Sequence, residues 1–450
     1  MIYLLFIVFL IMLYLTFIKF DKDIIAPPVV LVSGYTLSII CAIANVEKWG
    51  IVLHSNTFCV LIYGTLLFVL TAYFIKKYTF NKNKLIDYNK DYFNKISINL
   101  VYLKIYCIFQ CVFMLLWLGM IYYIISSMFQ INSYSDMMGN FRNWSTNNTD
   151  WINNYIYVFM IQIASITNIS AYLFLYILLF NFFSNVKEYN KYLIFSIILS
   201  IFQSVLSGGR LSMLAIIFAG IMFYMVFYYQ KYRKKFPINK KVILIFISSL
   251  VGGAVLFILS LAVARGGVIT IGNFIPYITF YVGGSIEGLN QFLQNPIESS
   301  KIFGKETFYS INFFLIRFGL YDVEPYKVHL EFREAITGAN IGNIYTAYRS
   351  YIYDFGYFGL TVLPVIFSAI INYLYYTAIK IIKKINIYLL FYSLIFWTLF
   401  FDFVRCFFFT GVFSIGMIKQ FLILIVLTAI FIKDFRIKDL WNNRNLEVKQ

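Results

Sequence analysis

Four arginines occupy positions where their side chains could bind phosphate. Arg210 follows Leu-Ser-Gly-Gly, and Arg265 lies within Ala-Arg-Gly-Gly. Arg349 and Arg405 stand at the ends of apolar runs. A guanidinium group makes planar, two-point contacts with phosphate oxygens, and neighbouring glycines let backbone N–H groups approach the same anion. The four residues therefore predict a diphosphate-binding pocket. Snorkelling of arginine at a membrane surface is the alternative explanation for their placement.

Carboxylates in the segment 265–357 supply candidates for a general base. Such a base takes the proton from an attacking hydroxyl and is usually a carboxylate or a histidine. Glu287 lies in a predicted amphipathic helix, Asp354 follows Arg349 closely, and His329 is the single histidine of the segment. A solvated, salt-bridged or structural role is the alternative for each of them. The acidic residues of the segment are Glu287, Glu298, Glu306, Asp322, Glu324, Glu331, Glu334 and Asp354.

Two further groups of residues complete the candidate site. Tyr345 and Tyr348 belong to a tyrosine-rich stretch whose rings could stack on sugars, although a membrane interface also favours tyrosine. Lys419 falls inside an apolar run, where a charge is costly and usually faces a cavity or a partner. We predict that it lines a substrate cavity or pairs with Asp402.

Motifs for metal-, nucleotide- or serine-based catalysis are missing. The sequence contains no Gly-x-Ser-x-Gly, His-Glu-x-x-His or P-loop motif, and the expected outer loops contain no Asp-x-Asp. With 2 histidines and 5 cysteines, none of them in Cys-x-x-Cys, neither a metal site nor a disulfide framework is indicated. We therefore expect chemistry without a metal or cofactor, on a donor that is already attached to lipid.

The composition is that of a membrane protein. Of the 450 residues, 61% are hydrophobic and 13% are charged, and the mean hydropathy is +0.77. A soluble protein has about 45–50% apolar and about 25% charged residues. The net charge of +17 comes from basic residues in alternate loops, which is a topology and lipid-contact signal rather than a nucleic-acid surface.

Apolar runs long enough to cross a bilayer predict an all-α polytopic fold of about 11 transmembrane helices. Of the 37 Lys and Arg residues, 24 lie in alternate loops and 11 in the opposite loops. This asymmetry places the N-terminus outside and the C-terminus in the cytoplasm. The predicted spans are 2–18, 27–46, 57–75, 101–125, 153–183, 192–207, 211–229, 242–264, 358–379, 387–401 and 411–432.

Residues 1–450 are expected to form one integral membrane domain with two enlarged outer loops, 126–152 and 265–357. In the second loop, the segment 272–284 is apolar but too short to span, and it predicts a re-entrant or interfacial element. From Ile286 the apolar residues repeat at helical spacing up to Asn295-Pro296, which predicts an amphipathic helix. Later, Ile341, Tyr345 and Tyr348 also follow a helical period.

The sequences SVLSGGRLSML at 204–214, YVGGSIEGLNQFLQNP at 281–296 and TGANIGNIYTAYRSYIYDFGYFGL at 337–360 carry a family resemblance. Together with the many spans and the enlarged late outer loop, they resemble the Wzy-type polymerases of O-antigen and capsular oligosaccharide repeat units. The resemblance covers most of residues 190–420. The first five spans match only in hydropathy.

The resemblance implies a glycosyltransferase of the bacterial inner, or cytoplasmic, membrane. It would transfer a growing glycan from undecaprenyl diphosphate onto a new lipid-linked repeat unit. Arg210, Arg265 and Arg349 would hold the diphosphate, and Glu287 or Asp354 would be the base. Membrane lipid is an expected partner, nucleic acid is not, and a chain-length regulator protein is left open. The competing functions are a lipid-linked oligosaccharide flippase or other transporter, and a ligase for O-antigen-like glycans.

Overall fold

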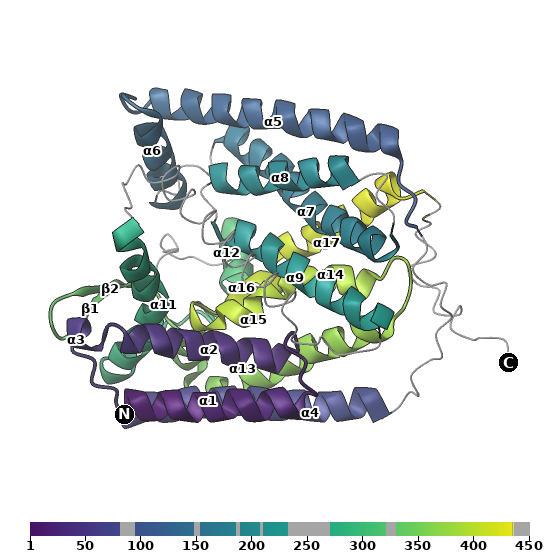
Figure 1. The fold of residues 1–450 in the computed structure, drawn as a ribbon. Helices are drawn as coiled ribbons and strands as arrows, with labels where there is room; N and C mark the ends of the chain where they lie inside the picture. The colour runs from purple at the N-terminus through teal and green to yellow at the C-terminus, as the bar shows by residue number, and fades with distance from the viewer. Residues whose placement is uncertain are drawn as a thin grey trace. The chain divides into compact units, whose positions relative to one another are not determined.

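The computed structural model describes residues 1–81, 95–147, 154–185, 190–207, 210–232, 271–320, 330–433 and 435. Within them the chain is an all-α protein with one small two-stranded sheet (Figure 1). The chain groups into two compact units, and each is described by itself. Unit 1 comprises Met1–Ile86, Thr270–Lys380 and Ile395–Met417, and unit 2 comprises Asp87–Ile269, Ile381–Leu394 and Ile418–Gln450. The expectation of one integral membrane domain stays a prediction.

Six of the described helices are long and apolar enough to cross a membrane. Their ranges are Ile2–Lys19, Ser55–Thr79, Leu100–Ser126, Tyr155–Phe183, Leu211–Tyr232 and Ala347–Lys380. Shorter apolar helices lie at Pro27–Ile43, Lys191–Leu206, Ile387–Phe403 and Ile415–Phe431. These helices fit an all-α membrane protein. The number of 11 spans stays a prediction, and the predicted span 242–264 lies outside the described residues.

Unit 1 is built from long helices that pack in pairs. Helix α4 packs on α13, and α2 packs on both α1 and α11 (Figure 1). Glycines make room for these contacts: a Cβ at Gly283 would lie 2.6 Å from the backbone N of Ala42 in α2. The elements of unit 1 are α1 (Ile2–Lys19), α2 (Pro27–Ile43), α3 (Val46–Trp49), α4 (Ser55–Asn81), α11 (Ile271–Gln294), α12 (Tyr309–Arg317), β1 (Arg333–Glu334), β2 (Asn340–Gly342), α13 (Ala347–Lys380), α15 (Trp397–Phe400), η3 (Phe401–Phe403) and α16 (Phe407–Val412).

Helix α13 consists of two pieces joined at Gly356. This residue has φ 61° and ψ −155°, a conformation that is open essentially only to glycine. The backbone O of Tyr351 then comes so close to Gly359 that a side chain there would clash. Gly356 and Gly359 thus separate the short piece that carries Arg349 from the apolar remainder of α13.

Helix α11 is continuous where the sequence suggested two elements. It runs from Ile271 through Pro276 to Gln294. Pro276 lies in the second turn, where it removes one helical hydrogen bond and leaves the rest of the helix intact. The helix ends where the Asn295-Pro296 pair predicted. A re-entrant path for its first half stays a prediction.

Unit 2 contains α5 (Leu100–Ser126), α6 (Tyr134–Asn147), α7 (Tyr155–Phe183), α8 (Asn190–Leu206) and α9 (Arg210–Tyr232), together with α14 (Ile387–Ile395) and most of α17 (Ile415–Phe431). Helix α6, in the loop expected at 126–152, is amphipathic. Its Met138 and Phe141 are buried in one apolar cluster with Trp117 of α5 and Tyr157 of α7. The loop therefore covers the ends of two long apolar helices.

A polar seam runs between α5, α7 and α8 of unit 2. Ser196 donates to Gln110 Oε1 at 2.5 Å, and Gln110 Nε2 donates to Ser200 Oγ at 3.0 Å. Ser204 donates to Asn168 Oδ1 at 2.6 Å. The serines recur every four residues along one face of α8, so the same small side chains permit close packing and interhelical hydrogen bonds.

Candidate functional site

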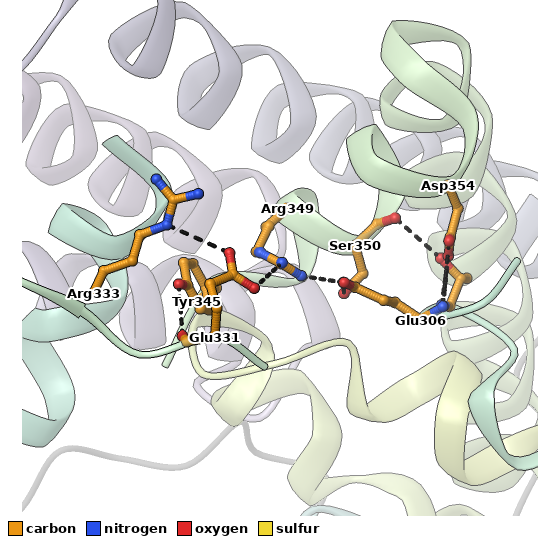
Figure 2. A network of polar contacts seen from close by, with 8 residues as sticks. Glu306, Glu331, Arg333, Tyr345, Arg349, Ser350 and Asp354 are labelled. Carbon is orange, nitrogen blue, oxygen red and sulfur yellow. Dashed lines mark hydrogen bonds and ion pairs between the residues drawn. The ribbon is translucent and has the colours of Figure 1, made fainter. Parts of the chain in front are cut away.

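A buried arginine is the centre of the candidate site. Arg349 lies in the first turn of α13 and is 1% exposed. Its Nη1 pairs with Glu306 Oε2, and its Nη2 pairs with Glu331 Oε2 at 2.6 Å (Figure 2). Two carboxylates from different parts of the chain therefore share one guanidinium group, and both contacts are charge-assisted hydrogen bonds.

Aromatic rings enclose the Arg349 guanidinium. Its Cζ atom lies 4.5 Å from the ring centroid of Tyr345, 4.9 Å from that of Phe292 and 5.5 Å from that of Tyr353. A cation over an aromatic face gains about 0.5–2 kcal/mol, with the larger values where water is excluded. The Tyr345 hydroxyl donates to the backbone O of Glu331 at 2.9 Å, and so the ring also fixes the segment that carries one carboxylate.

A second arginine joins this group to the end of α11. Arg333 Nη1 donates to Gln291 O at 2.7 Å, and Nη2 donates to Asn295 O at 2.9 Å. These carbonyls lie at and just beyond the last turn of α11, where helical partners are missing and positive charge is favourable. Arg333 Nε also lies 3.4 Å from Glu331 Oε1. Glu331 therefore lies between two guanidinium groups.

Asp354 fixes the backbone of the loop that carries Glu306. Its carboxylate accepts the backbone N–H of Glu306 at 3.1 Å and that of Thr307 at 2.6 Å (Figure 2). Ser350, one turn earlier on α13, donates to Glu306 Oε2 at 3.1 Å. Asp354 thus positions Glu306 against Arg349. Its predicted role as a base has not been tested.

Glycines on α11 allow the segment before α13 to approach closely. A Cβ at Gly284 would lie 2.9 Å from Ile341 O, and one at Gly288 would lie 2.5 Å from Ile344 O. Phe292, the next residue on this face at a spacing of four, contacts Arg349. The glycines of the sequence Gly-Gly-Ser-Ile-Glu-Gly at 283–288 therefore let the segment that carries Tyr345 pack closely on α11.

The two arginines keep Glu331 ionised. Burial works to raise the pKa of Glu331, but the charge and hydrogen bond of Arg349, with a further contribution from Arg333, outweigh it. The resulting pKa lies below the usual value. The Glu331 side chain is 28% exposed, whereas the Glu306 side chain is 12% exposed. Glu331 is therefore the more exposed of the two carboxylates that pair with Arg349.

We expect the Glu331–Arg349 ion pair to stabilise the fold at neutral pH and to lose that effect in acid. A lowered pKa gives stability that is complete above the pKa of the unfolded chain, about 4.3, and is lost as pH falls through the folded value. Thermal unfolding in detergent should therefore separate the parent from Glu331→Gln by a constant difference down to about pH 5, which then shrinks. A difference that widens in acid would contradict this assignment.

Glu287 lies on α11, and its hydrogen-bond partners are side chains of the same helix. It is 0% exposed, and its two oxygens accept from Asn290 Nδ2 at 3.0 Å and from Gln291 Nε2 at 2.7 Å. Burial raises its pKa, and these hydrogen bonds offset part of the rise. Gln291 bonds to Glu287 through its side chain and to Arg333 through its carbonyl. Glu287 remains a candidate base that both amides now hold in place.

Tyr348 points away from Arg349. Its hydroxyl lies 2.9 Å from Thr65 Oγ1, and its ring stacks on Tyr35 with centroids 5.3 Å apart. Gly64 of α4 makes room for this ring, because a Cβ there would lie 2.8 Å from it. Tyr345 and Tyr348 are both buried in the described structure, so sugar stacking on them stays a prediction.

The buried carboxylate of Asp402 is hydrogen-bonded to Tyr35, the residue on which Tyr348 stacks. Asp402 is 1% exposed; its Oδ2 accepts from the Tyr35 hydroxyl at 2.9 Å, and its Oδ1 has no hydrogen-bond partner among the described residues. An ionised carboxylate with one hydrogen bond is costly in an apolar interior, which favours the neutral acid.

We therefore expect Asp402→Asn to change the free energy of unfolding little, because an amide reproduces the shape of a neutral acid and still accepts from Tyr35. Tyr35→Phe should instead cost about 1–3 kcal/mol, because it leaves a buried acceptor unpaired. Melting temperatures in detergent would compare the two variants. The opposite order of stabilities would refute a neutral Asp402.

Arg405 and Lys419 lie apart from the Arg349 group in their described contacts. Arg405 Cζ lies 5.9 Å from the ring centroid of Tyr309. Lys419 Nζ donates to Gln162 Oε1 at 2.5 Å within unit 2, whereas Asp402 belongs to unit 1. The expected Lys419–Asp402 pair is not among these contacts. The Arg210 side chain, Arg265 and His329 lie outside the described residues, so their roles stay predictions.

Arg333 was not singled out from the sequence, and Glu306 and Glu331 were named only among the acidic residues of the segment 265–357. Glu331 and Arg333 are two residues apart in a segment that leads into a strand, where alternate side chains share a face. That spacing is a weak local signal. Glu306 has no such local signal in the sequence, because its position depends on hydrogen bonds from the backbone of residues 306 and 307 to Asp354.

The described residues contain no group of three His, Cys, Asp or Glu side chains that could hold a metal ion. Comparison of the chain with models of protein families, with curated proteins and with solved structures found no match.

Proposed function

We propose that this membrane protein is a glycosyltransferase that polymerises oligosaccharide units carried on polyprenyl diphosphate, with its site at the Arg349 group. One observation carries the proposal. A buried arginine, a second arginine, three carboxylates and several aromatic rings gather at the start of a candidate membrane-spanning helix. Such a group offers both a cation for a lipid diphosphate and a base for a sugar hydroxyl.

The proposed reaction needs no redox partner. The acceptor hydroxyl oxygen attacks the anomeric carbon of the donor glycan, and the bond from that carbon to the diphosphate oxygen breaks. The electron pair leaves with polyprenyl diphosphate, and the hydroxyl proton passes to a carboxylate. Positive charge held close to the departing diphosphate lowers the barrier, because it meets charge that develops in the transition state.

The charges of the Arg349 group suggest that a bound diphosphate would replace one of the carboxylates that pair with Arg349. When all five groups are ionised, two guanidinium groups face three carboxylates, Glu306, Glu331 and Asp354. A diphosphate would therefore bind Arg349 by displacing a carboxylate, and Glu331 is the more exposed partner. Released from the cation, Glu331 would regain a higher pKa and become a better base. A role of Arg210 and Arg265 in binding diphosphate stays a prediction from the sequence.

Deletion of the gene and complementation with variants would test this function. Loss of a polymerase leaves single repeat units on the final acceptor, so a polysaccharide gel should lose its ladder of long chains. Glu331→Gln should fail to restore the ladder. Glu298→Gln, the same change at an exposed residue of the same segment, should restore it. Long chains retained on the carrier lipid would instead identify a ligase.

A lipid-linked oligosaccharide transporter is the second candidate, favoured by the polar seam of unit 2. A transport path needs polar groups among its membrane helices, and Gln110, Ser196 and Ser200 supply them. Purified protein in vesicles would separate the two functions. A polymerase lengthens lipid-linked chains supplied on one side, whereas a transporter moves them across unchanged.

The proposal includes placement in the cytoplasmic membrane of a bacterium, with the N-terminus outside and the C-terminus in the cytoplasm. Its basis is the distribution of basic residues between alternate loops. Reporter fusions at both ends, active on only one side of the membrane, would test this orientation.

A further inference from the structure

In helix α12, the polar residues Ser310 and Asn312 bind the protein, and several apolar residues are exposed. Asn312 is 3% exposed, and its Nδ2 donates to the backbone O of Phe303 and of Gly304, both at 3.0 Å. Ser310 donates to Thr410 O at 2.5 Å. These two polar side chains therefore bind the protein. A surface helix in water would have them on its solvent side.

The exposed face of α12, which lies between Ser310 and Asn312, is apolar. Ile311 is 38% exposed, Phe314 is 38% exposed and Phe318, at the C-cap, is 65% exposed. Leu315, which is partly exposed, lies between them on the same face because the four residues follow a spacing of three and four. The rings of Phe314 and Phe318 lie 4.5 Å apart. The face thus forms one continuous apolar stripe.

This stripe continues into the apolar surface of a candidate membrane span. Phe308, the N-cap residue of α12, has its ring centroid 6.1 Å from that of Phe355 in α13. Phe303, which is 72% exposed, lies 5.0 Å from the same Phe355 ring. In the second piece of α13, just after Gly356, Phe358 is 74% exposed. An apolar surface that continues from a span has the chemistry of a lipid-facing surface.

We propose that α12 lies in the membrane–water interface with Ile311, Phe314, Leu315 and Phe318 in contact with the acyl chains of the bilayer. Exposed Lys301, in the segment before α12, would meet anionic headgroups. Burial of this apolar face in lipid holds the loop between Phe303 and Phe308, which carries Glu306, at the membrane surface. The inference does not depend on the proposed glycosyltransferase activity.

Fluorescence quenching would test it. Phe314→Trp and Phe318→Trp would each be reconstituted, beside the parent with its 6 tryptophans, in vesicles of phosphatidylcholine and phosphatidylglycerol. Bromine atoms placed on the acyl chains should quench most of the emission that each variant adds to the parent. Aqueous iodide should leave that added emission unchanged.

Quenching by iodide and not by bromine would overturn the proposal, because the face would then lie in water. Absence of quenching by either reagent would also overturn it, because the face would then be covered by protein. Equal melting temperatures of the parent and the two variants in detergent would establish that they share one fold. Two positions are used so that a local defect at one of them does not decide the result.

Discussion

Replacing Arg349 with alanine should be the most damaging single substitution at the candidate site. The change leaves the carboxylates of Glu306 and Glu331 without their shared cation inside a largely buried group. Breaking a buried ion pair by removing one partner costs about 3–5 kcal/mol, because the remaining charge stays desolvated. We expect a large fall in melting temperature in detergent and, if the proposed function holds, loss of long-chain polysaccharide.

Arg349→Lys and Arg405→Ala are the informative companions. Lysine keeps the charge but lacks the planar fork that reaches two carboxylates at once, so its stability should be intermediate. Arg405 packs over Tyr309 and is in no ion pair within the described residues, so its loss should cost less than about 1 kcal/mol. Equal losses for Arg349→Ala and Arg405→Ala would show that the two carboxylates do not depend on Arg349.

Gly288→Ala should be the second large effect, although it adds a single methyl group. A Cβ at this position would lie 2.5 Å from Ile344 O and 3.1 Å from Tyr345 Cδ1. The backbone cannot yield as a flexible side chain can, and overpacking of this kind typically costs about 1–3 kcal/mol. Because Tyr345 packs on Arg349 and binds the Glu331 backbone, the displacement should also reduce activity at the site.

Gly119→Ala in α5 provides a matched control. A Cβ there meets nothing within 4 Å, so the substitution adds the same atoms to another helix without a clash. Its free energy of unfolding should be unchanged or should rise by up to about 1 kcal/mol from helix propensity. Thermal unfolding of both variants in one detergent checks the prediction. A Gly288→Ala protein as stable as Gly119→Ala would mean that α11 and the Tyr345 segment are not in close contact.

Long apolar segments were predictable from the sequence because hydropathy depends on composition and not on tertiary contacts. Ile2–Lys19 and Leu100–Ser126 appear as helices close to their predicted limits. The predicted span 358–379 matches the apolar piece of α13 that follows Gly356, and the short piece that carries Arg349 lies before this joint. Pro276 lies inside α11, since a proline near a helix start is tolerated.

The candidate site was predictable only in part. Arg349, Asp354 and Tyr345 were candidates from their types and spacing, and the structure brings them into one group. Their partners Glu306 and Glu331 lie 43 and 18 residues from Arg349, and no periodicity relates such distant positions. The direction of Tyr348 was equally hidden, because it depends on the space that Gly64 leaves on another helix.

The glycine joint in α13 has a consequence for bilayers of different thickness. A long apolar helix adjusts to a thinner or thicker hydrocarbon layer by tilting. Because regular helix geometry stops at Gly356, the longer piece can change its tilt by rotation about one residue. The short piece keeps its bonds to the 306–307 loop and to Glu331. We therefore expect the joint at Gly356 to reduce the effect of hydrophobic mismatch on the geometry around Arg349.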